Sequence, residues 1–573
     1  MNLEFIGSIF IIYGRFLLYA FSSSMESPVR ISQSGKIRGR ITERVAGFPV
    51  EEYLGIPYAA PPIGANRFQR PREHVPWTDT LNATKLPPAC YQGEINAGYI
   101  KLHMPEFDMN YQNEDCLFLN IYVPKSLEKN VSYAVMFYIH GGSNRAGMGA
   151  MLPGDILAAH GQIIVINFNY RLGLLGFLSS PQHNFTGNNG LLDQVAAMRW
   201  VHSNIHYFDG DRDRITIAGH SAGAGDVGLH LVSPLTKGLF RNAILMSGSP
   251  LAHWAMASPD QFPGSNINAT ILQYALDVAD IRTIDIKDIK AIEIIFSTLL
   301  PFSVVPYPAV VDNYFLTKYP RSSFQNGDFH GNKFLVSFTA DESFGPLLGP
   351  DFKIDFPGYL VRYEPFYPTI CNFKDTLISV YSDIEDPGRR LVEAEADMLF
   401  YASIIELSDL LSDSDVKPEV NVFEYDIKMP KPNQANWEAV DHGEDIFYLF
   451  GIPLIGSTLQ NFTEKDIEAS ELEMTLYSNF VKTELFSMDG LTRLGRLYNE
   501  QHRSYCRMYF DGNNVTFGHF QNFRKSKMEF WNEVEEKKQT SCDKASKANK
   551  NYFDIYFLYS LYITVLFLKY IVQ

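Results

Sequence analysis

Residues 219–223 of this 573-residue chain read Gly-His-Ser-Ala-Gly, which places one serine, Ser221, between two glycines. The preceding residues 215–218 are typical of a short buried strand, and the run from Ala222 to Val232 predicts a helix. A sharp strand-to-helix turn lifts a serine hydroxyl out of a sheet and over a helix N-terminus. We therefore expect Ser221 to be a nucleophile, and the alternative is an ordinary glycine-rich connection between a strand and a helix.

A serine hydroxyl reacts only when a base takes its proton, and the base is usually a histidine that a carboxylate orients. After a strand–serine–helix turn these partners follow in the order acidic residue, then histidine. Glu342 follows the apolar residues 334–338, and His442 stands in a polar loop before the apolar residues 446–450. Spacing alone is weak evidence for either residue, because the chain has 14 histidines and most loop histidines lie on a surface.

Attack by a serine on a carbonyl group places negative charge on an oxygen atom, which needs backbone N–H donors fixed in advance. One donor belongs to the residue after the nucleophile, Ala222, and the others come from a glycine loop after an earlier strand. Residues 140–143, His-Gly-Gly-Ser, follow the apolar residues 134–139 and have this context. The alternative is a glycine turn that only ends the strand.

Strand candidates alternate with helical stretches along the chain. The strands are expected at residues 134–139, 163–168, 215–218, 242–247, 334–338 and 420–425. Helical periodicity is found at residues 192–205 and 467–482. This alternation predicts an α/β fold with a large, mostly parallel central sheet flanked by helices. The candidate residues follow strands, as expected where active sites lie at the carboxyl ends of a sheet.

Composition indicates one large globular domain. The chain is 46% hydrophobic and 20% charged, and no Pro/Gly/Ser-rich linker, repeat or low-complexity tract divides its middle. Its formal net charge is −16, from 65 acidic and 49 basic residues, and it has no basic stripe. We therefore do not expect nucleic acid as a partner.

The two ends differ from the middle. Residues 1–24 are typical of a secretory signal peptide, although Arg15 interrupts the apolar stretch, and a short membrane anchor is the alternative. Residues 25–535 are the predicted globular domain. Residues 536–573 combine small residues, a polar spacer and a terminal apolar run, which is typical of a GPI-anchor signal. A transmembrane helix at 552–572 is the alternative, and either anchor would hold the protein at the cell surface.

Glycosylation motifs and cysteines fit an exported protein. Six N-x-S/T sequons begin at Asn82, Asn130, Asn184, Asn268, Asn461 and Asn514. Among the five cysteines, Cys90 and Cys116 are close enough in sequence to close a loop, and a pairing of Cys371 with Cys506 stays open. Cys542 lies beside the proposed anchor site, and three fates are open for it: a bridge between two subunits of a homodimer, removal with the tail, or a free thiol.

Further motifs resemble those of one family. They are residues 55–62 with Arg67 and Phe68, and residues 114–120, 169–173, 190–194, 208–211 and 231–234, together with the serine motif. Over residues 29–530 the chain resembles the type-B carboxylesterase/cholinesterase family of α/β-hydrolases. The resemblance implies the α/β-hydrolase fold and hydrolysis of carboxylic esters through a serine acyl-enzyme, with no metal or organic cofactor.

The same resemblance assigns roles to individual residues. The implied catalytic triad consists of Ser221 as nucleophile, Glu342 as carboxylate and His442 as base. The implied oxyanion-hole donors are the backbone N–H groups of Gly142, Ser143 and Ala222. The implied structural contacts are a disulfide between Cys90 and Cys116 and the ion pairs Arg67–Glu114 and Arg171–Asp193.

The chain departs from the family pattern at several places. Ser143 stands where the oxyanion loop usually has a third glycine, and serine fits there freely only if the position needs no positive φ. His220 and Glu106 stand where cholinesterases have a glutamate and a choline-stacking tryptophan, respectively. No cysteine lies between Cys116 and Cys371 to form the family's second disulfide. A quaternary ammonium prefers an aromatic face, so the sequence does not favour acetylcholine as substrate.

We therefore expect a secreted or cell-surface carboxylesterase whose substrate is a small-molecule carboxylic ester, bound in a gorge lined by aromatic side chains. A non-catalytic adhesion or receptor protein on the same fold is the alternative, because some members of the family lack a working triad. A cholinesterase is a narrower alternative within the enzyme class. The complete set of serine, glutamate and histidine favours catalysis over adhesion.

Overall fold

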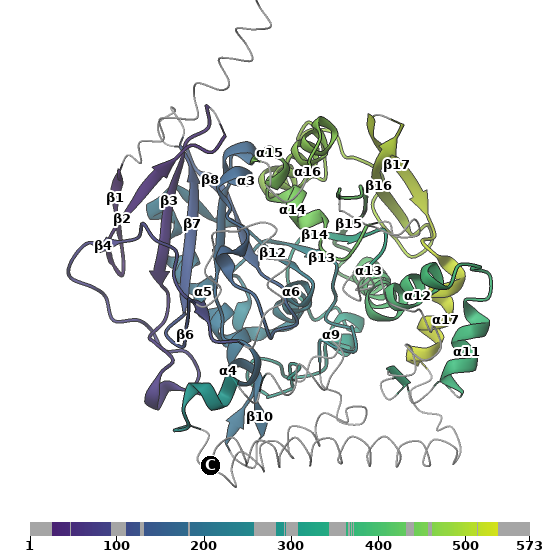
Figure 1. The fold of residues 1–573 in the computed structure, drawn as a ribbon, viewed down its shortest axis with the longest axis horizontal. Helices are drawn as coiled ribbons and strands as arrows, with labels where there is room; N and C mark the ends of the chain where they lie inside the picture. Colours follow the sequence, from purple (N-terminus) through teal and green to yellow (C-terminus); the bar gives the residue numbers. More distant parts are fainter. Residues whose placement is uncertain are drawn as a thin grey trace, which may run out of the picture.

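A computed structural model describes most of the chain between residues 26 and 536 (Figure 1). The described segments are residues 26–45, 47–92, 111–125, 131–180, 184–256, 282–290, 293, 307–342, 363–364, 367, 370, 372–430, 440–455, 461–512 and 514–536. The predicted signal peptide at 1–24 and the predicted anchor in the tail lie outside the described residues. Cys371, Cys542 and Glu106 also lie outside them.

One large sheet forms the framework of the molecule. Its strands are, in spatial order, β1 (Glu26–Ser32), β2 (Gly35–Thr42), β3 (Val50–Pro57), β7 (Phe118–Pro124), β9 (Ile164–Phe168), β8 (Tyr133–Ile139), β12 (Gly210–His220), β13 (Asn242–Met246), β14 (Lys333–Thr339), β15 (Glu419–Asp426), β16 (Ser504–Asp511) and β17 (Asn514–Gln521), with β4 (Leu81–Asn82) beside β2. Two short pairs stand apart from it: β5 (Ala89–Cys90) with β6 (Gln112–Asn113), and β10 (Ser179–Ser180) with β11 (Phe185–Thr186).

The centre of the sheet is parallel and its two ends are antiparallel. Every pairing from β9 through β8, β12, β13, β14 and β15 to β16 is parallel. The successive pairings from β1 to β9, and the C-terminal pair of β16 with β17, are antiparallel. The predicted α/β fold with a mostly parallel sheet is confirmed, and all six predicted strands are present. The antiparallel strands were not predicted, and Figure 1 shows them in purple at one edge and yellow at the other.

Alternating side chains of the central strands build a hydrophobic core on each face. In β8, Val135 and Phe137 pack into one core, and Met136 and Tyr138 pack into the other. Successive residues of a strand point to opposite faces, so a strand covered on both sides must be apolar throughout. This explains why the predicted strands appeared in the sequence as continuous apolar runs.

Helices cover both faces (Figure 1). One core includes side chains from α4 (Gly173–Phe177), α5 (Asn189–Asn204), α6 (Ala222–Val232), α9 (Pro320–Gln325), α11 (Phe373–Val380), α12 (Pro387–Ala396), α13 (Ala402–Asp413) and α17 (Lys525–Glu536). The other includes side chains from α3 (Asp155–Gly161), α14 (Asp445–Leu449), α15 (Ile452–Ile455) and α16 (Glu464–Thr483). All three predicted helices are present, as α5, α6 and α16. Helix α16 begins earlier than predicted because Thr463 and Asp466 form a reciprocal capping box there.

In the part of the chain that the structure describes, no helix is both long enough and apolar enough to cross a bilayer. Four sequon asparagines lie in that part and all four are exposed: Asn82, Asn184, Asn461 and Asn514. Asn130 and Asn268 lie outside it. The four exposed asparagines are accessible to glycosylation, which stays a prediction.

Candidate active site

Loops at the carboxyl ends of neighbouring strands bring the candidate residues together. The glycine loop follows β8, Ser221 follows β12, Glu342 follows β14 and His442 follows β15. Strands β8, β12, β13, β14 and β15 are consecutive neighbours in the sheet, so their carboxyl ends lie along one edge. Residues as far apart in sequence as Ser221 and His442 therefore meet.

Ser221 occupies a sharp turn between β12 and α6. Its backbone has φ 58° and ψ −125°, a strained conformation for a residue other than glycine. Close backbone packing requires glycine nearby: a Cβ on Gly219 would lie 2.3 Å from the carbonyl oxygen of Gly223, and a Cβ on Gly248 would lie 2.2 Å from that of Ser221. The Ser221 N–H donates to the carbonyl oxygen of Met246 at 2.8 Å, which ties the turn to β13.

His442 lies between the serine and the glutamate. Its Nε2 is 2.9 Å from the Ser221 Oγ, and its Nδ1 is 2.5 Å from the Glu342 Oε2. With Nδ1–H donated to the carboxylate, Nε2 carries the lone pair that accepts the serine proton. Burial lowers the pKa of His442, so the imidazole is neutral at pH 7 and able to act as a base. Its ring packs on Phe400, with ring centroids 4.4 Å apart.

Glu342 is fully buried in the loop that follows β14. Its Oε1 accepts the backbone N–H of Thr339 at 2.8 Å, which leaves Oε2 for His442. Burial raises the pKa of Glu342, while the Ser247 hydroxyl and Thr339 lower it. The two carboxylate oxygens therefore have different and fixed partners, and the side chain has one orientation toward the imidazole.

Tyr401 holds the loop that carries Glu342. Its hydroxyl donates to the carbonyl oxygen of Thr339 at 2.7 Å and accepts the N–H of Glu342 at 3.2 Å. Tyr401 is the last residue of a π-helical turn, η9 (Asp397–Tyr401), between α12 and α13. Such turns are rare and are frequent at functional sites. Here the turn supplies the residue that fixes both ends of a four-residue loop.

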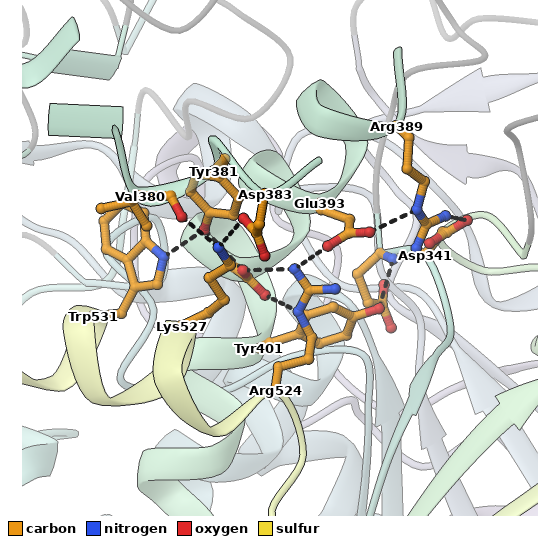
Figure 2. Close-up of polar contacts among 12 residues, drawn as sticks. Asp341, Val380, Tyr381, Asp383, Arg389, Glu393, Tyr401, Arg524, Lys527 and Trp531 are labelled. Atoms are coloured by element: carbon orange, nitrogen blue, oxygen red, sulfur yellow. Dashed lines mark hydrogen bonds and ion pairs between the residues drawn. The ribbon is translucent and has the colours of Figure 1, made fainter. Parts of the chain in front are cut away.

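Ion pairs surround this loop (Figure 2). Arg524, immediately before α17, pairs with Asp397 at 2.7 Å and with Glu393 at 2.7 Å. Arg389 pairs with Glu393 at 2.8 Å and with Asp341 at 2.6 Å. Figure 2 shows Glu393 between the two arginines. Because Asp341 belongs to the same loop as the candidate carboxylate, this network connects that loop to α12 and to the start of α17.

The glycine loop after β8 lies against the serine turn. A Cβ on Gly141 would be 2.5 Å from the carbonyl oxygen of His220 and 2.9 Å from the Cβ of Ser221. Gly142 has φ 111°, and Ser143 has φ 56°. Ser143 thus does not meet the condition under which serine replaces glycine freely, since the position is left-handed. Holding a serine in this conformation costs about 1 kcal/mol.

Three backbone N–H groups beside Ser221 have no acceptor. Within the described residues, the N–H groups of Gly142, Ser143 and Ala222 donate no hydrogen bond. Ala222 is the first residue of α6, where helix geometry leaves the N–H groups without internal partners. Unpaired N–H groups and a helix N-terminus both stabilise negative charge next to them. The structure therefore places the three predicted oxyanion-hole residues where such a role is possible.

His220 lies beside the candidate base. The His220 and His442 ring centroids are 4.7 Å apart. Burial lowers the pKa of His220 well below its usual value, and the neighbouring His442 lowers it further. The ring is therefore neutral at the position where cholinesterases carry an anionic glutamate. This environment has no charge there to attract a cationic substrate.

Comparison with known proteins identifies the family. Residues 26–531 match the family described as the Carboxylesterase family. The chain belongs to the Carboxylesterase family. The match includes nearly all of the described region, and the large mixed sheet with helices on both faces is the α/β-hydrolase fold.

The proteins similar to this carboxylesterase-family chain include neuroligins and a protein named as a hydrolase. Neuroligin-3 of Mus musculus is 31% identical over 535 residues, which are 82% of this chain and 63% of neuroligin-3. Neuroligin-2 of Homo sapiens is 32% identical over 522 residues, which are 80% of this chain and 60% of neuroligin-2. Pyrethroid hydrolase Ces2a of Mus musculus is 31% identical over 508 residues, which are 83% of this chain and 87% of Ces2a. The chain thus spans about three fifths of the length of the neuroligins.

Structural contacts expected of this carboxylesterase-family chain are present. The predicted disulfide is confirmed, with Cys90 and Cys116 joined by an S–S bond of 2.04 Å. Both predicted ion pairs are bidentate: Arg67 with Glu114 at 2.7 and 2.5 Å, and Arg171 with Asp193 at 2.7 Å for each bond. These contacts join segments of the chain between residues 67 and 193 that are distant in sequence.

The third cysteine in the described part of the chain gives a different result. Cys506 lies in β16 and is free and buried, so the pairing with Cys371 that the sequence left open is not formed. Burial raises the pKa of Cys506 to about 12. The thiol is therefore protonated and unreactive at neutral pH.

Two buried residues near the candidate site, Tyr401 and Asp226, were not predicted from the sequence. Asp226 had a usable signal, because it is an acidic residue within the glycine and apolar run of α6, five positions after Ser221. Tyr401 had none, because its partners Thr339 and Glu342 are about 60 residues away in sequence. Aromatic residues around a substrate gorge, which we expected, stay a prediction.

Proposed function

We propose that this protein hydrolyses small-molecule carboxylic esters through a serine acyl-enzyme. The observation that supports this most strongly is the continuous chain of contacts from the Ser221 Oγ through His442 to Glu342, at 2.9 and 2.5 Å. The unpaired N–H groups next to the serine add support. So does the relative named a pyrethroid hydrolase, which shares 31% identity.

In the proposed reaction, the Ser221 Oγ attacks the ester carbonyl carbon while the His442 Nε2 takes the hydroxyl proton. The N–H groups of Gly142, Ser143 and Ala222 stabilise the oxyanion of the tetrahedral intermediate. Its collapse expels the alcohol, which leaves with the proton from Nε2, and the acyl group stays on Oγ. Water then attacks the acyl-enzyme with the same imidazole as base, and the acid is released. Glu342 orients the ring and stabilises its cationic form.

We further propose that the protein works outside the cell or on its surface. A disulfide such as Cys90–Cys116 persists in oxidising compartments. The exposed sequon asparagines support the same location. A GPI anchor or a membrane helix in the tail, and a homodimer bridged through Cys542, remain predictions. Release from intact cells by a phosphatidylinositol-specific phospholipase C separates the two kinds of anchor.

A non-catalytic protein that binds other proteins is the second candidate. The family includes adhesion and receptor proteins without a working triad, and the neuroligin relatives carry a name that specifies no reaction. The left-handed Ser143 in the oxyanion loop also favours this candidate, because it adds strain and a side chain beside the hole. A cholinesterase is the third candidate, and the neutral His220 counts against it.

Covalent labelling tests the proposal directly. A fluorophosphonate probe is expected to modify the native protein at Ser221, as located by mass spectrometry of peptides, and to leave the urea-unfolded protein unlabelled. The labelled protein should lose all hydrolysis of p-nitrophenyl acetate in proportion to the fraction modified. Native protein that neither takes the label nor hydrolyses this ester would support the binding candidate instead. Turnover of acetylthiocholine would support the cholinesterase candidate.

Replacement of Tyr401 by phenylalanine should lower kcat about tenfold and leave KM nearly unchanged, because Glu342 loses its fixed orientation. The buried partners Thr339 and Glu342 also lose a hydrogen bond each, which costs about 1–3 kcal/mol of stability. Both quantities are measured by ester kinetics and thermal unfolding.

Tyr381→Phe is the matched control for this variant. The Tyr381 hydroxyl belongs to the same network, donating to Asp397 at 2.8 Å and accepting from Trp531 at 2.9 Å, but it does not contact the Glu342 loop (Figure 2). It should lower the melting temperature and keep kcat. Equal losses of kcat in both variants would show that the effect comes from general destabilisation.

A further inference from the structure

A buried carboxylate lies behind the oxyanion loop and has no part in the reaction steps above. Asp226 is on α6 and only 2% of its surface is exposed. Its Oδ1 accepts the Nδ2–H of Asn144 at 3.0 Å, and its Oδ2 accepts the Nε2–H of Gln194 at 2.7 Å. None of the ion pairs among the described residues includes Asp226. Such a charge is costly to bury and persists only where specific partners hold it.

Asn144 has two further partners, Tyr170 and Gly173. The Tyr170 hydroxyl lies 3.1 Å from the Asn144 Oδ1 and 2.8 Å from the carbonyl oxygen of His140. The rings of Tyr170 and His140 are stacked, with their centroids 4.4 Å apart. The Asn144 carbonyl oxygen accepts the N–H of Gly173 at 2.7 Å. At the far end, the His230 Nε2 lies 2.7 Å from the Oε1 of Gln194. Both polar atoms of the Asn144 side chain and its carbonyl oxygen therefore have hydrogen-bond partners.

The loop needs such support because its backbone is strained. Gly142, Ser143 and Asn144 have φ values of 111°, 56° and 54°, so three consecutive residues are left-handed. Left-handed residues other than glycine persist only when surrounding contacts over-determine them. Burial raises the pKa of Asp226 to about 7, whereas the bonds from Gln194 and Asn144 lower it. The two amide donors thus favour the carboxylate form, which accepts both bonds at once.

We propose that Asp226 is a positioning residue of the oxyanion hole, and this rests on the proposed ester hydrolysis. The hole has two halves: the N–H groups of Gly142 and Ser143 in the loop, and the N–H of Ala222 at the start of α6. Asp226 lies on that same helix, one turn further along, and bonds to the residue that follows Ser143. The carboxylate therefore fixes the spacing between the halves, acting through Asn144.

Asp226→Asn tests this with little change in shape. One oxygen becomes an amide that must face an N–H donor of Asn144 or Gln194, so one bond is lost. We expect kcat to fall about 10- to 100-fold with KM within about twofold, since displaced donors affect the transition state more than the bound ester. Affinity for a trifluoromethyl ketone, which forms a tetrahedral adduct on the serine, should fall by the same factor as kcat/KM.

A double-mutant cycle shows whether the carboxylate acts through the loop. Asn144→Ala alone should give a loss of similar size, and Asp226→Asn added to it should cause little further loss. Independent, multiplying losses would overturn the proposal. Asp409→Asn breaks a different ion pair, with Arg503 at 2.8 Å, and is the control for lower stability without loop displacement. If Asp226→Asn fails to fold, Asn144→Ala still tests the role, because unchanged kcat in it would overturn the proposal.

Hydrogen–deuterium exchange gives a readout that needs no activity. The N–H groups of Arg145 and Ala146 donate to the Gly142 carbonyl oxygen at 3.0 Å. Amides in residues 141–147 should exchange faster in Asp226→Asn and unchanged in Asp409→Asn. Faster exchange in a protein that hydrolyses no ester would leave the positioning role standing and remove the proposed function. An active wild type with unchanged exchange and kcat in Asp226→Asn would overturn the positioning role alone.

Discussion

Replacement of Ser221 by alanine is expected to lower kcat for p-nitrophenyl acetate by about 10⁴-fold or more, because no acyl-enzyme can form without the hydroxyl oxygen. The residual rate comes from the oxyanion donors and from binding. The variant should fold normally, because backbone contacts set the turn: the Ser221 N–H donates to Met246, and Gly219 and Gly223 allow the close approach of strand and helix. Stopped-flow and steady-state kinetics measure the loss, and thermal unfolding checks the fold.

Ser408→Ala is the matched control for the removal of a buried serine hydroxyl. Ser408 lies in α13, and its hydroxyl donates to the carbonyl oxygen of Ile404 at 2.9 Å. Its replacement should leave kcat unchanged. If Ser221→Ala kept more than about one hundredth of the wild-type kcat, a different group would be the nucleophile and the triad mechanism would be wrong.

Replacement of Glu342 by glutamine should lower kcat by about 10³- to 10⁴-fold. The reason lies in the two fixed partners of the carboxylate. The Thr339 N–H requires an oxygen acceptor at its position, so the glutamine amide must point toward the His442 Nδ1. That nitrogen then accepts a hydrogen bond, and the imidazole proton moves to Nε2, where it blocks transfer from the Ser221 hydroxyl.

The test for this variant combines kinetics with a direct view of the tautomer. Nitrogen NMR of labelled histidine should show the His442 proton on Nδ1 in the wild type and on Nε2 in Glu342→Gln. Asp155→Asn, a buried acid on α3 that pairs with Arg44, is the control that should keep kcat. A kcat loss below about tenfold in Glu342→Gln would show that the carboxylate does not select the tautomer.

The parallel half of the fold was readable from the sequence because its strands are apolar on both faces. β8 and β9 are buried at every position, so they appear as unbroken apolar runs. β3 was not readable in this way, because it carries Glu51 and Glu52 in its interior and both are buried. Arg30 and Arg40 neutralise them at 2.9 and 2.7 Å, which no local pattern reveals.

The candidate site likewise contains some residues that the sequence predicts and others that it does not. Ser221 and the glycine loop stand in local contexts that predict their conformation, and the order of Glu342 and His442 follows from the family. Asp226 and Tyr401 depend on partners from distant segments, and only the folded chain brings these together. Ser143 shows the limit of reading a motif: whether serine fits depends on the φ angle of the position, which is 56° in the folded chain and is not evident from the sequence.

The strained turn at residue 221 has an evolutionary consequence. Its φ and ψ angles are imposed by glycine contacts and a backbone hydrogen bond, none of which involves the hydroxyl. A lineage can therefore discard the reactive oxygen in a single mutational step and inherit an undamaged scaffold whose surface is free to acquire new partners. A single reverse mutation likewise restores the nucleophile, since the backbone keeps the geometry that a serine at this position requires.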